Sequence, residues 1–452
     1  MQATSFFNGV SGLKSFSQGL NIVADNLANS NTYGYKSSRA EFADVLYREL
    51  SYTGSDLTTE IDQVGQGATV WSHQLMNQGA IQETGRTLDL AIDGNGFFTV
   101  KNLDTEELYY TRAGQFGVDG VVGQEGFIIN DQGYRLQGFA IGDDGEPIVG
   151  NLIDLQIPVE NLPGEATTIV GLGVNLNPAD TRVNQVATDI DPEVSGTYNY
   201  SSSTTVYDAN GDTHQISVYY QRVDDYAGTV PEGGQTVWKA STFETQDGEQ
   251  VANPADPANT FYLHFTDTGA LAGVTDSTGA TVSADSIGLT MDFGEAGQQA
   301  ITLDFAPAAG QATTQVAEGY STSTNTQDGF AEGGLESVAV SEDGFVTAYY
   351  SNGEMVDVGV VALTTFASPG NLRREGDNLW AYDADAGEIW VGQPTDEEFA
   401  MGAIEDQSLE TSTVDTATEM MNMIIYQRAF QASSKTVTTS DEMIKTAINM
   451  KT

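Results

Sequence analysis

The stretch ATSFFNGVSGLKSFSQGLNIVADNLA, residues 3–28, decides much of the fold. Its apolar side chains recur at alternating spacings of four and three residues, which is the pattern of a coiled-coil seam. The opposite face carries asparagine, serine, glutamine and aspartate. The pattern therefore predicts an amphipathic α-helix with one narrow apolar stripe, which follows Phe6, Val10, Leu13, Ser17, Leu20, Ala24 and Leu27 and is widened on one side by Phe16 and Val23.

Three glycines, Gly9, Gly12 and Gly19, lie inside this predicted helix. Each one costs a helix about 0.5–1 kcal/mol relative to alanine. A helix of this length is only marginally stable in isolation, even when it is built from good helix formers. We therefore expect it to form only where neighbouring segments cover the apolar stripe.

A second helix is predicted near the C-terminus, over residues 413–449. Apolar side chains recur there every seven residues, at Met423, Phe430, Val437 and Ile444, and are flanked by Met420, Ile424, Ala447 and Ile448. Asp415 near the start, with Lys445 and Lys451 near the end, agrees with the helix dipole. Two interpretations stay open: the terminal helices pack on the core of their own chain, or they pack against other copies.

The distribution of charge favours packing against other copies. The chain has 452 residues with 64 acidic and 17 basic side chains, for a net charge of −47. Residues 1–50 hold four basic and four acidic side chains, and residues 410–452 hold four basic and five acidic ones, which leaves −46 for the middle. Two nearly neutral ends can approach other protein, whereas an acidic middle stays in solvent. Such a chain also repels nucleic acid and anionic membranes, so we expect neither as a partner.

Several functional classes are excluded by what the sequence lacks. It contains no cysteine, which rules out disulfides, thiol catalysis and thiolate metal sites. No run approaches the ~18–20 apolar residues that a membrane span needs. The N-terminus lacks the basic region and unbroken apolar core of a cleaved secretory signal. If the protein leaves the cell, we expect an export route that does not read such a signal.

The middle of the chain is predicted to be rich in β-strands. Asp-Gly and Asn-Gly pairs, which suit tight hairpin turns, occur throughout it, at Asp93, Asp119, Asp144, Asn210, Asp247, Asp328, Asp343 and Asn352. Two hairpins are predicted, from Thr204–Tyr207 with Gln215–Tyr220 and from Phe345–Tyr350 with Met355–Leu363. No segment from 75 to 405 has convincing helical periodicity. Residues 160–320 differ in composition and are predicted to form an inserted β-domain.

No candidate catalytic or metal site emerges from the residues. The three histidines, His73, His214 and His264, are far apart and lack the spacing of metal ligands. The segment from Asp208 to Asp212 resembles the start of a calcium loop, but its glycine is one place early and Tyr219 stands where glutamate is needed. Gly94-Asn95-Gly96 lacks the third glycine of a dinucleotide fingerprint. We interpret both as turns and predict no enzyme, no cofactor and no metal.

Several motifs stand out at both ends of the chain and in the segment after residue 75. The N-terminal one is DNLANSNTYGYK at 25–36, followed by EFAD at 41–44. Further along are QG at 78–79, TGRTLDLAIDGNGFF at 84–98 and YTRAGQF at 110–116, and near the C-terminus are GDNLW at 376–380 and MNMIIYQRAFQA at 421–432. In this order they resemble the N-terminal signature, the first β-domain and the C-terminal signature of the family of bacterial flagellar basal-body rod and hook axial proteins. The resemblance covers both ends and most of 75–145 and 328–405, but not 165–315.

The resemblance implies a multidomain fold with terminal α-helical coiled-coil segments and two mainly antiparallel β-domains that are discontinuous and nested. The expected divisions are a helical polymerisation domain at 1–33 and 409–452, a connecting arm at 34–74, a first β-domain at 75–160 and 320–408, and an inserted outer β-domain at 161–319. A rod subunit would be shorter and lack the insertion, so the hook members of the family fit better. They imply a curved, flexible tube that transmits torque from the basal-body rod to the filament.

The resemblance also implies partners and an extracellular location in the flagellum. The expected partners are other copies in a homopolymer, the distal rod protein, the hook–filament junction protein, the hook cap during assembly and the flagellar type III export apparatus. Terminal helices are expected to line the inner wall, with the β-domains outward. The predicted subunit-packing residues are Phe6, Val10, Leu13, Leu20, Leu27, Met420, Met423, Ile424, Phe430, Val437 and Ile444, and the family motif residues are Asn26, Ala28, Asn29, Thr32, Gly34, Tyr35 and Lys36.

Elementary chemistry assigns roles to some motif residues and leaves a rival function open. Gly34 can take backbone conformations closed to other residues, as a chain leaving a helix requires. Asn26 and Asn29 can bond to backbone groups where the helix ends. The rival is an acidic, calcium-binding surface protein such as an adhesin, for which the termini would be dispensable. Because an acidic outer region repels itself within a screening length of about 8–10 Å, we also expect salt or divalent cations to strengthen assembly.

Overall fold

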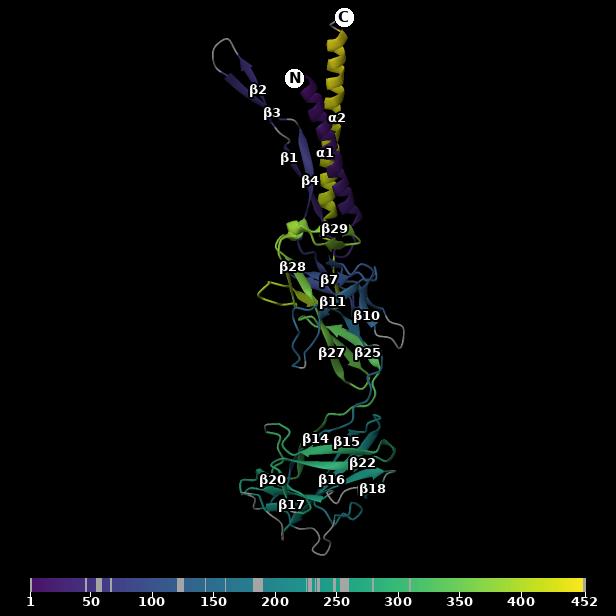
Figure 1. Ribbon diagram of the computed structural model, residues 1–452, viewed down its shortest axis with the longest axis vertical. Coiled ribbons are helices and arrows are strands. Elements are labelled where there is room, and N and C mark those ends of the chain that lie inside the picture. The colour runs from purple at the N-terminus through teal and green to yellow at the C-terminus, as the bar shows by residue number, and fades with distance from the viewer. Residues whose placement is uncertain are drawn as a thin grey trace. The chain divides into compact units, whose positions relative to one another are not determined.

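The computed structural model describes residues 2–44, 47–53, 59–65, 67–119, 126–142, 144–158, 160–181, 190–224, 226, 230–231, 233, 236–246, 249–252, 260–278, 280–308 and 310–449. The chain forms two compact units (Figure 1). Unit 1 comprises Met1–Glu160, Glu336–Tyr349 and Met355–Thr452, and unit 2 comprises Asn161–Leu335 and Tyr350–Glu354. Lys451, Gly120 of the predicted turn at Asp119-Gly120, and the predicted turn at Asp247-Gly248 lie outside the described residues.

Both predicted terminal helices are present in unit 1. The N-terminal helix α1 spans Gln2–Ala28 and the C-terminal helix α2 spans Thr416–Asn449. The predicted start of the second helix at residue 413 was too early, because Asp415 caps the helix. Its Oδ1 accepts a hydrogen bond from the Thr418 backbone N–H at 2.9 Å, and its carbonyl accepts one from the Glu419 N–H. No helix among the described residues has the length and apolar character needed to cross a membrane.

The two helices lie side by side (Figure 1). The glycines of α1 face α2. A Cβ atom at Gly9 would lie 2.7 Å from Val437 Cγ2, and one at Gly12 would lie 2.9 Å from Ser433 Oγ. The glycines therefore allow the two backbones to approach closely, which offsets their poor helix propensity. Gly9, Gly12 and Val437 therefore take part in a contact within one chain, and packing of the two helices against other copies stays a prediction.

Two β-ribbons follow α1 in the chain. Strands β1 (Ser38–Asp44) and β4 (Ala68–Gln74) pair antiparallel, as do β2 (Tyr47–Thr53) and β3 (Thr59–Gly65). The β1–β4 ribbon packs on the helices: the Phe42 ring lies 5.4 Å from Phe16 and 5.6 Å from Tyr426, and the Ser11 and Ser15 hydroxyls each donate to the Ala68 carbonyl at 2.7 Å. This ribbon thus covers part of the helices from within the same chain.

The rest of unit 1 is mostly β-structure, as predicted. Its main sheet has the order β25-β26-β27-β11-β7-β8-β30-β29, and the remaining strands pair at its sides or in two short ribbons, β5–β33 and β6–β32. The strands are β5 (Ile81–Glu83), β6 (Ala91–Asp93), β7 (Phe97–Lys101), β8 (Leu108–Thr111), β9 (Phe116–Asp119), β10 (Gly126–Asn130), β11 (Arg135–Phe139), β12 (Ile153–Asp154), β13 (Gln156–Ile157), β25 (Leu335–Val340), β26 (Phe345–Tyr350), β27 (Met355–Val361), β28 (Leu363–Phe366), β29 (Arg373–Gly376), β30 (Leu379–Ala381), β31 (Ile389–Gly392), β32 (Ala403–Glu405) and β33 (Ser408–Glu410).

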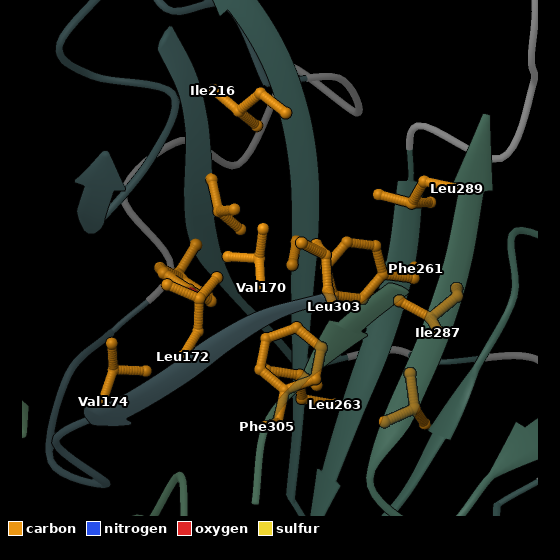
Figure 2. Close-up of a cluster of buried hydrophobic side chains, with 14 of the residues drawn as sticks. Val170, Leu172, Val174, Ile216, Phe261, Leu263, Ile287, Leu289, Leu303 and Phe305 are labelled. Atoms are coloured by element: carbon orange, nitrogen blue, oxygen red, sulfur yellow. The ribbon is translucent and has the colours of Figure 1, made fainter. Parts of the chain in front are cut away.

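Unit 2 is built from two sheets that share one apolar core. One sheet has the order β22-β23-β14-β24 and the other β15-β16-β17-β19-β20-β21, with β18 beside β17. The core takes side chains from both sheets, including Leu172, Leu263 and Leu303 (Figure 2). The strands are β14 (Ile169–Asn175), β15 (Tyr200–Tyr207), β16 (Thr213–Val223), β17 (Thr236–Gln246), β18 (Glu249–Ala252), β19 (Thr260–Phe265), β20 (Leu271–Thr275), β21 (Thr281–Ser283), β22 (Ser286–Asp292), β23 (Gln298–Asp304) and β24 (Ser321–Gln327).

Both predicted hairpins are confirmed. Strands β15 and β16 pair antiparallel up to Tyr207 opposite Thr213, and β26 and β27 pair up to Tyr349 opposite Met355. Gly211 adopts a φ of +83° between the first pair. In the described part of residues 75–405 the only helical segments are three short 3₁₀ turns, at Gly294–Ala296, Pro369–Asn371 and Ala384–Ala386, in agreement with the absence of helical periodicity.

Candidate functional site

The helical pair α1–α2 leaves large apolar side chains in solvent. Ile424 is 52% exposed and Val10 is 42% exposed, and Met420 and Phe430 are exposed as well. The other predicted packing residues are partly buried: Phe6, Leu13, Leu20, Leu27, Met423, Val437 and Ile444. Further exposed apolar side chains, outside the predicted packing set, are Phe7, Met421, Ile425, Met443 and Ile448. Two helices and one ribbon cannot surround both apolar faces, so a substantial apolar surface remains available.

The chain segments next to the two helices run beside each other. The Gly34 N–H donates to the Glu410 carbonyl at 2.7 Å, and the Thr413 N–H donates to the Tyr35 carbonyl at 3.2 Å. The Ser37 N–H donates to Thr413 Oγ1 at 2.9 Å. These contacts form a junction, residues 33–38 with 410–413, at which both ends of the chain meet the β-structure of unit 1.

Gly34 is required by this junction. Its φ is +69°, and a Cβ atom there would lie 2.5 Å from the backbone nitrogen of Ala113. Any other residue would meet both a strained backbone and a steric clash. Gly34 therefore allows the chain that leaves α1 to pass directly over the backbone that follows the strand ending at Thr111.

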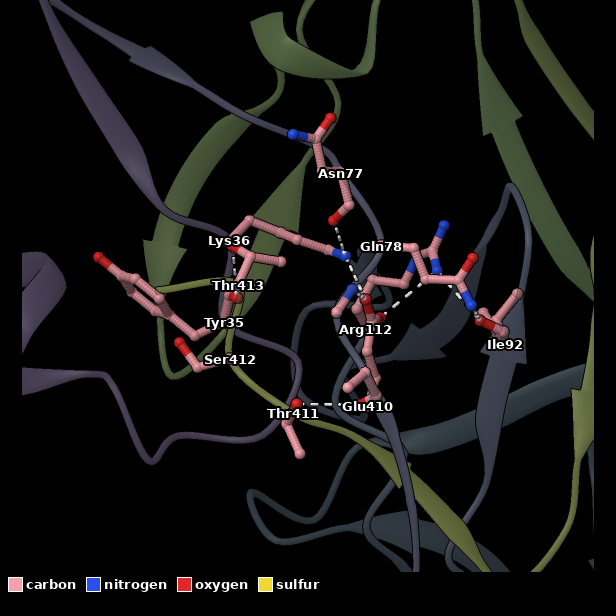
Figure 3. Close-up of polar contacts among 12 residues, drawn as sticks. Tyr35, Lys36, Asn77, Gln78, Ile92, Arg112, Glu410, Thr411, Ser412 and Thr413 are labelled. Atoms are coloured by element: carbon pink, nitrogen blue, oxygen red, sulfur yellow. Dashed lines mark hydrogen bonds and ion pairs between the residues drawn. The ribbon is translucent and has the colours of Figure 1, made fainter. Parts of the chain in front are cut away.

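A buried ion cluster holds the junction together (Figure 3). Lys36 Nζ lies 2.5 Å from Glu410 Oε1, and Arg112 Nη1 lies 3.4 Å from Glu410 Oε2; all three side chains are almost completely buried. Lys36 Nζ also donates to the Asn77 carbonyl at 2.7 Å, and the Gly79 N–H donates to Glu410 Oε1 at 2.5 Å. The carboxylate of Glu410, from the C-terminal segment, therefore binds Lys36 from the N-terminal segment and Arg112 from the segment directly after strand β8.

The electrostatics of the cluster are asymmetric, with two cations against one carboxylate. Burial, followed by the nearby positive charge of Arg112, lowers the pKa of Lys36 to about 8, although Glu410 opposes this shift. Burial also lowers the pKa of Arg112. The Arg112 guanidinium also donates hydrogen bonds to two backbone carbonyls, that of Gly94 at 2.8 Å and that of Ile92 at 3.4 Å.

The other motif residues lie around the end of α1. Asn26 is buried and exchanges two hydrogen bonds with the Ser38 backbone, at 2.7 and 2.9 Å. Asn29 Nδ2 donates to the Asp25 carbonyl at 3.0 Å, and Thr32 Oγ1 donates to Asn29 Oδ1 at 3.2 Å. Ala28 is exposed and makes no such contact that would explain its place in the motif.

Tyr35 fixes the direction of the chain after the helix. Its hydroxyl donates to Asp25 Oδ2 at 3.1 Å, and the Arg374 guanidinium lies 5.2 Å from the centre of its ring. Burial raises the pKa of the Tyr35 hydroxyl, so the group stays protonated and keeps its role as a donor. The Asn378 side chain adds a bond from Nδ2 to the Tyr33 carbonyl at 3.0 Å.

The structure offers no metal centre among its described residues, where no three His, Cys, Asp or Glu side chains converge. His73 lies exposed in unit 1, while His214 and His264 lie in unit 2. His214 contacts Glu244 at 2.9 Å, and burial lowers the pKa of His264 to about 4. Asp208 accepts backbone hydrogen bonds from Asn210 and Asp212, so the calcium-like segment is a turn.

Comparison with known proteins gives four family matches along the chain. They are the flagella basal body rod protein family at residues 7–36, the flagellar hook protein FlgE/F/G D1 domain at 91–174, the flagellar basal body protein FlaE D2 domain at 175–330 and the flagellar basal body rod FlgEFG protein C-terminal family at 405–450. Together they define the class as axial proteins of the bacterial flagellum.

Full-length relatives narrow this class. The chain is 32% identical to the flagellar hook protein FlgE of Treponema pallidum and 29% identical to that of Escherichia coli; the alignments cover 99% of this chain in both cases, and 99% and 100% of the relatives. A crystal structure of Helicobacter pylori flagellar hook protein FlgE2 has a similar fold, with a TM-score of 0.55 at 17% identity over 73% of this chain and 100% of that one. The chain belongs to the flagellar hook protein FlgE family.

Proposed function

We propose that this chain is a structural subunit of the bacterial flagellar hook and that it self-assembles into a curved, flexible tube. The tube transmits torque from the basal-body rod to the filament. The observation that carries the proposal is the apolar surface that remains exposed on α1 and α2 after they have packed on each other, in a chain whose relatives over its full length are hook proteins. A homopolymer supplies the neighbours that such a surface requires.

The helical pair is proposed as the polymerisation element, with residues 1–33 and 409–452 forming coiled-coil-like contacts between copies. The predicted packing residues divide into two groups in this proposal. Exposed side chains such as Val10, Met420, Ile424 and Phe430 would contact other copies, and the partly buried ones would hold α1 against α2. Burying one such side chain is worth about 1.5–3 kcal/mol, so a few contacts for each copy suffice for a stable polymer.

The remaining divisions of the chain follow from the same proposal. Residues 34–74 connect the helices to a first β-domain at 75–160 and 320–408, into which an outer β-domain at 161–319 is inserted. The helices form the inner wall of a tube outside the cell. Its contacts at the two ends are the distal rod protein and the hook–filament junction protein, the hook cap guides assembly, and the flagellar type III apparatus exports the subunit.

The charge distribution supports a division of labour during bending. The middle of the chain carries −46 of the net charge of −47, so outer surfaces of neighbouring copies stay hydrated and slide past one another. The apolar contacts of the helices hold at the same time. A comparison of the contacts between copies on the compressed and extended sides of a bent tube tests this division of labour. Sliding at the helices would refute it.

Truncation of both helices tests the proposed function. A chain that begins at Ser30 and ends at Val414 keeps the β-structure but lacks the helical pair. The full chain should form short curved tubes in electron micrographs, whereas the truncated chain should stay monomeric with an unchanged β-sheet circular dichroism signal. Tubes formed by the truncated chain would show that the helices are dispensable, as expected for a surface protein of another class.

A further inference from the structure

A second feature of the ion cluster is not explained by its role at the junction. Lys36 and Arg112 both line a cavity of about 270 Å³ in unit 1. The cavity is smaller than the roughly 300–1,000 Å³ of typical sites for drug-sized molecules, so it suits a small ligand. Four aromatic side chains line part of it: Phe97, Phe366, Trp390 and Phe399.

Two buried polar atoms at this cavity have no hydrogen-bond partner among the described residues. Arg112 is 5% exposed and its Nε makes no hydrogen bond, and Thr365 is 8% exposed and its Oγ1 makes none. Both residues line the cavity. Buried polar atoms without a partner are costly, at about 1–3 kcal/mol each, so their placement at one cavity requires an explanation.

The charge of the cavity points to the kind of partner. In the part of the chain that the structure describes, Lys36 and Arg112 pair with one carboxylate, that of Glu410, which leaves one positive charge uncompensated in a buried place. Lys36 has three donors and uses two of them, on Glu410 and Asn77. An uncompensated buried cation favours an anion, and Arg112 with Thr365 offers the donors that a carboxylate accepts.

We propose that this cavity binds a small carboxylate that carries an apolar group, with the carboxylate on Arg112, Lys36 and Thr365 and the apolar group against the aromatic wall. Thr365 is paired in register with Trp390 across strands β28 and β31, so the polar and apolar parts of the site adjoin each other. The guanidinium of Arg112 lies 5.3 Å from the centre of the Phe97 ring, which joins the two parts on the other side.

Titration of the full-length protein with benzoate tests the proposal at constant ionic strength, with chloride as the balancing anion. Tryptophan fluorescence reports binding, and a Trp390→Phe variant should lose the signal because Trp390 lines the cavity. Benzoate should bind about tenfold or more tightly than acetate, because only benzoate places a ring against the aromatic wall. Neutral benzamide should bind at least about tenfold more weakly than benzoate, because it leaves the buried cation uncompensated.

Neighbouring threonines provide a matched pair of variants. Thr365→Val removes a hydroxyl that bonds to none of the described residues, so it should weaken benzoate binding about fivefold without lowering the melting temperature. Thr364→Val removes a hydroxyl that bonds to Thr99 at 2.7 Å and does not line the cavity, so it should lower the melting temperature and leave benzoate affinity unchanged. A structural role of Thr365 alone would not produce this opposite pattern.

Three outcomes would overturn the proposal. Benzoate and benzamide could bind equally, which would remove the role of the charge. A second such outcome is that neither benzoate nor acetate binds more tightly than chloride, which would mean that water fills the cavity. The third is that benzoate binds to the monomer but not to the assembled tube, which would mean that an acidic side chain of a neighbouring copy occupies the cavity in the tube. The proposal of a free ligand instead predicts equal benzoate affinity in monomer and tube.

Discussion

Unit 2 and the helical pair use the same kinds of apolar side chain in opposite ways. In unit 2, Leu263 and Trp238 are 0% exposed, and two sheets from one chain close the core completely. In the helical pair, Ile424 stays 52% exposed although α1, α2 and a β-ribbon all lie together. The first arrangement is finished by folding. The second is completed only by assembly, and a buried polar cluster joins the two chain segments that adjoin the helices.

The largest expected effect concerns that polar cluster. Glu410→Gln removes the carboxylate shared by Lys36 and Arg112 and leaves two buried cations without a counter-charge. Breaking a buried ion pair in this way costs about 3–5 kcal/mol. Urea unfolding followed by a signal from unit 1 should show this loss. Glu405→Gln, a matched change at an exposed carboxylate on β32, should cost less than about 0.5 kcal/mol. Equal losses in the two variants would mean that the cluster does not hold the junction.

A slightly smaller effect is expected in the closed core. Leu263→Ala opens a cavity between the sheets of unit 2 and should lower its free energy of unfolding by about 2–5 kcal/mol. The critical concentration for tube formation should stay unchanged at a temperature where the variant is folded, because no side chain of this core faces solvent. A raised critical concentration would show that folding of unit 2 and assembly are coupled, which would break the comparison.

The contrast also explains what could be predicted from the sequence. The terminal helices and the β-rich middle depend on local signals: heptad spacing around Leu13 and Phe430, and hairpin pairs such as Asn210-Gly211. The close approach of Gly9 to Val437 was invisible, because no local pattern tells whether a helix stripe meets its own chain or another copy. The contact partners of the three glycines therefore could not be predicted from the sequence.

The ion cluster could not be predicted for a different reason. Lys36 and Glu410 are separated by 374 positions, and no local periodicity connects them. Lys36 was selected only through the family resemblance, and Arg112 stood in a quoted motif without a role. Glu410 was missed because nothing distinguishes it among 64 acidic side chains. Only the fold, which brings the junction together, shows that this carboxylate is buried and shared.

A smaller effect is expected on the open side of the comparison. Ile424→Asp places a charge on exposed apolar surface, so the monomer should lose no more than about 0.5 kcal/mol of stability. Assembly should lose the burial of this side chain, worth about 1.5–3 kcal/mol, and the critical concentration should rise roughly tenfold or more. Ile424→Leu, which keeps volume and polarity, is the matched control and should assemble normally. Light scattering and sedimentation measure the assembly of both variants. Normal assembly of Ile424→Asp would show that Ile424 does not lie in the interface between copies.

The smallest effect is a pH dependence that only the polar cluster should show. The pKa of Lys36 is about 8 in the folded chain against an ordinary value of 10.5, so between these values the folded state has released a proton that the unfolded state still binds. Stability contributed by Lys36 therefore rises with pH in this window, and the rise between pH 7.5 and 9 should be about 1 kcal/mol. The reason is that deprotonation relieves the desolvation of a buried ammonium group beside Arg112.

The measurement is the free energy of unfolding of unit 1 at both pH values, with Lys36→Met as the reference that lacks the titrating group. Since Lys36 lies in unit 1, the unfolding transition of unit 2 should show no such difference between the two variants. The difference in the free energy of unfolding of unit 1 between the two variants could instead stay constant or fall with pH. This would mean that Glu410 outweighs burial and keeps Lys36 charged, so that the junction is a conventional ion pair.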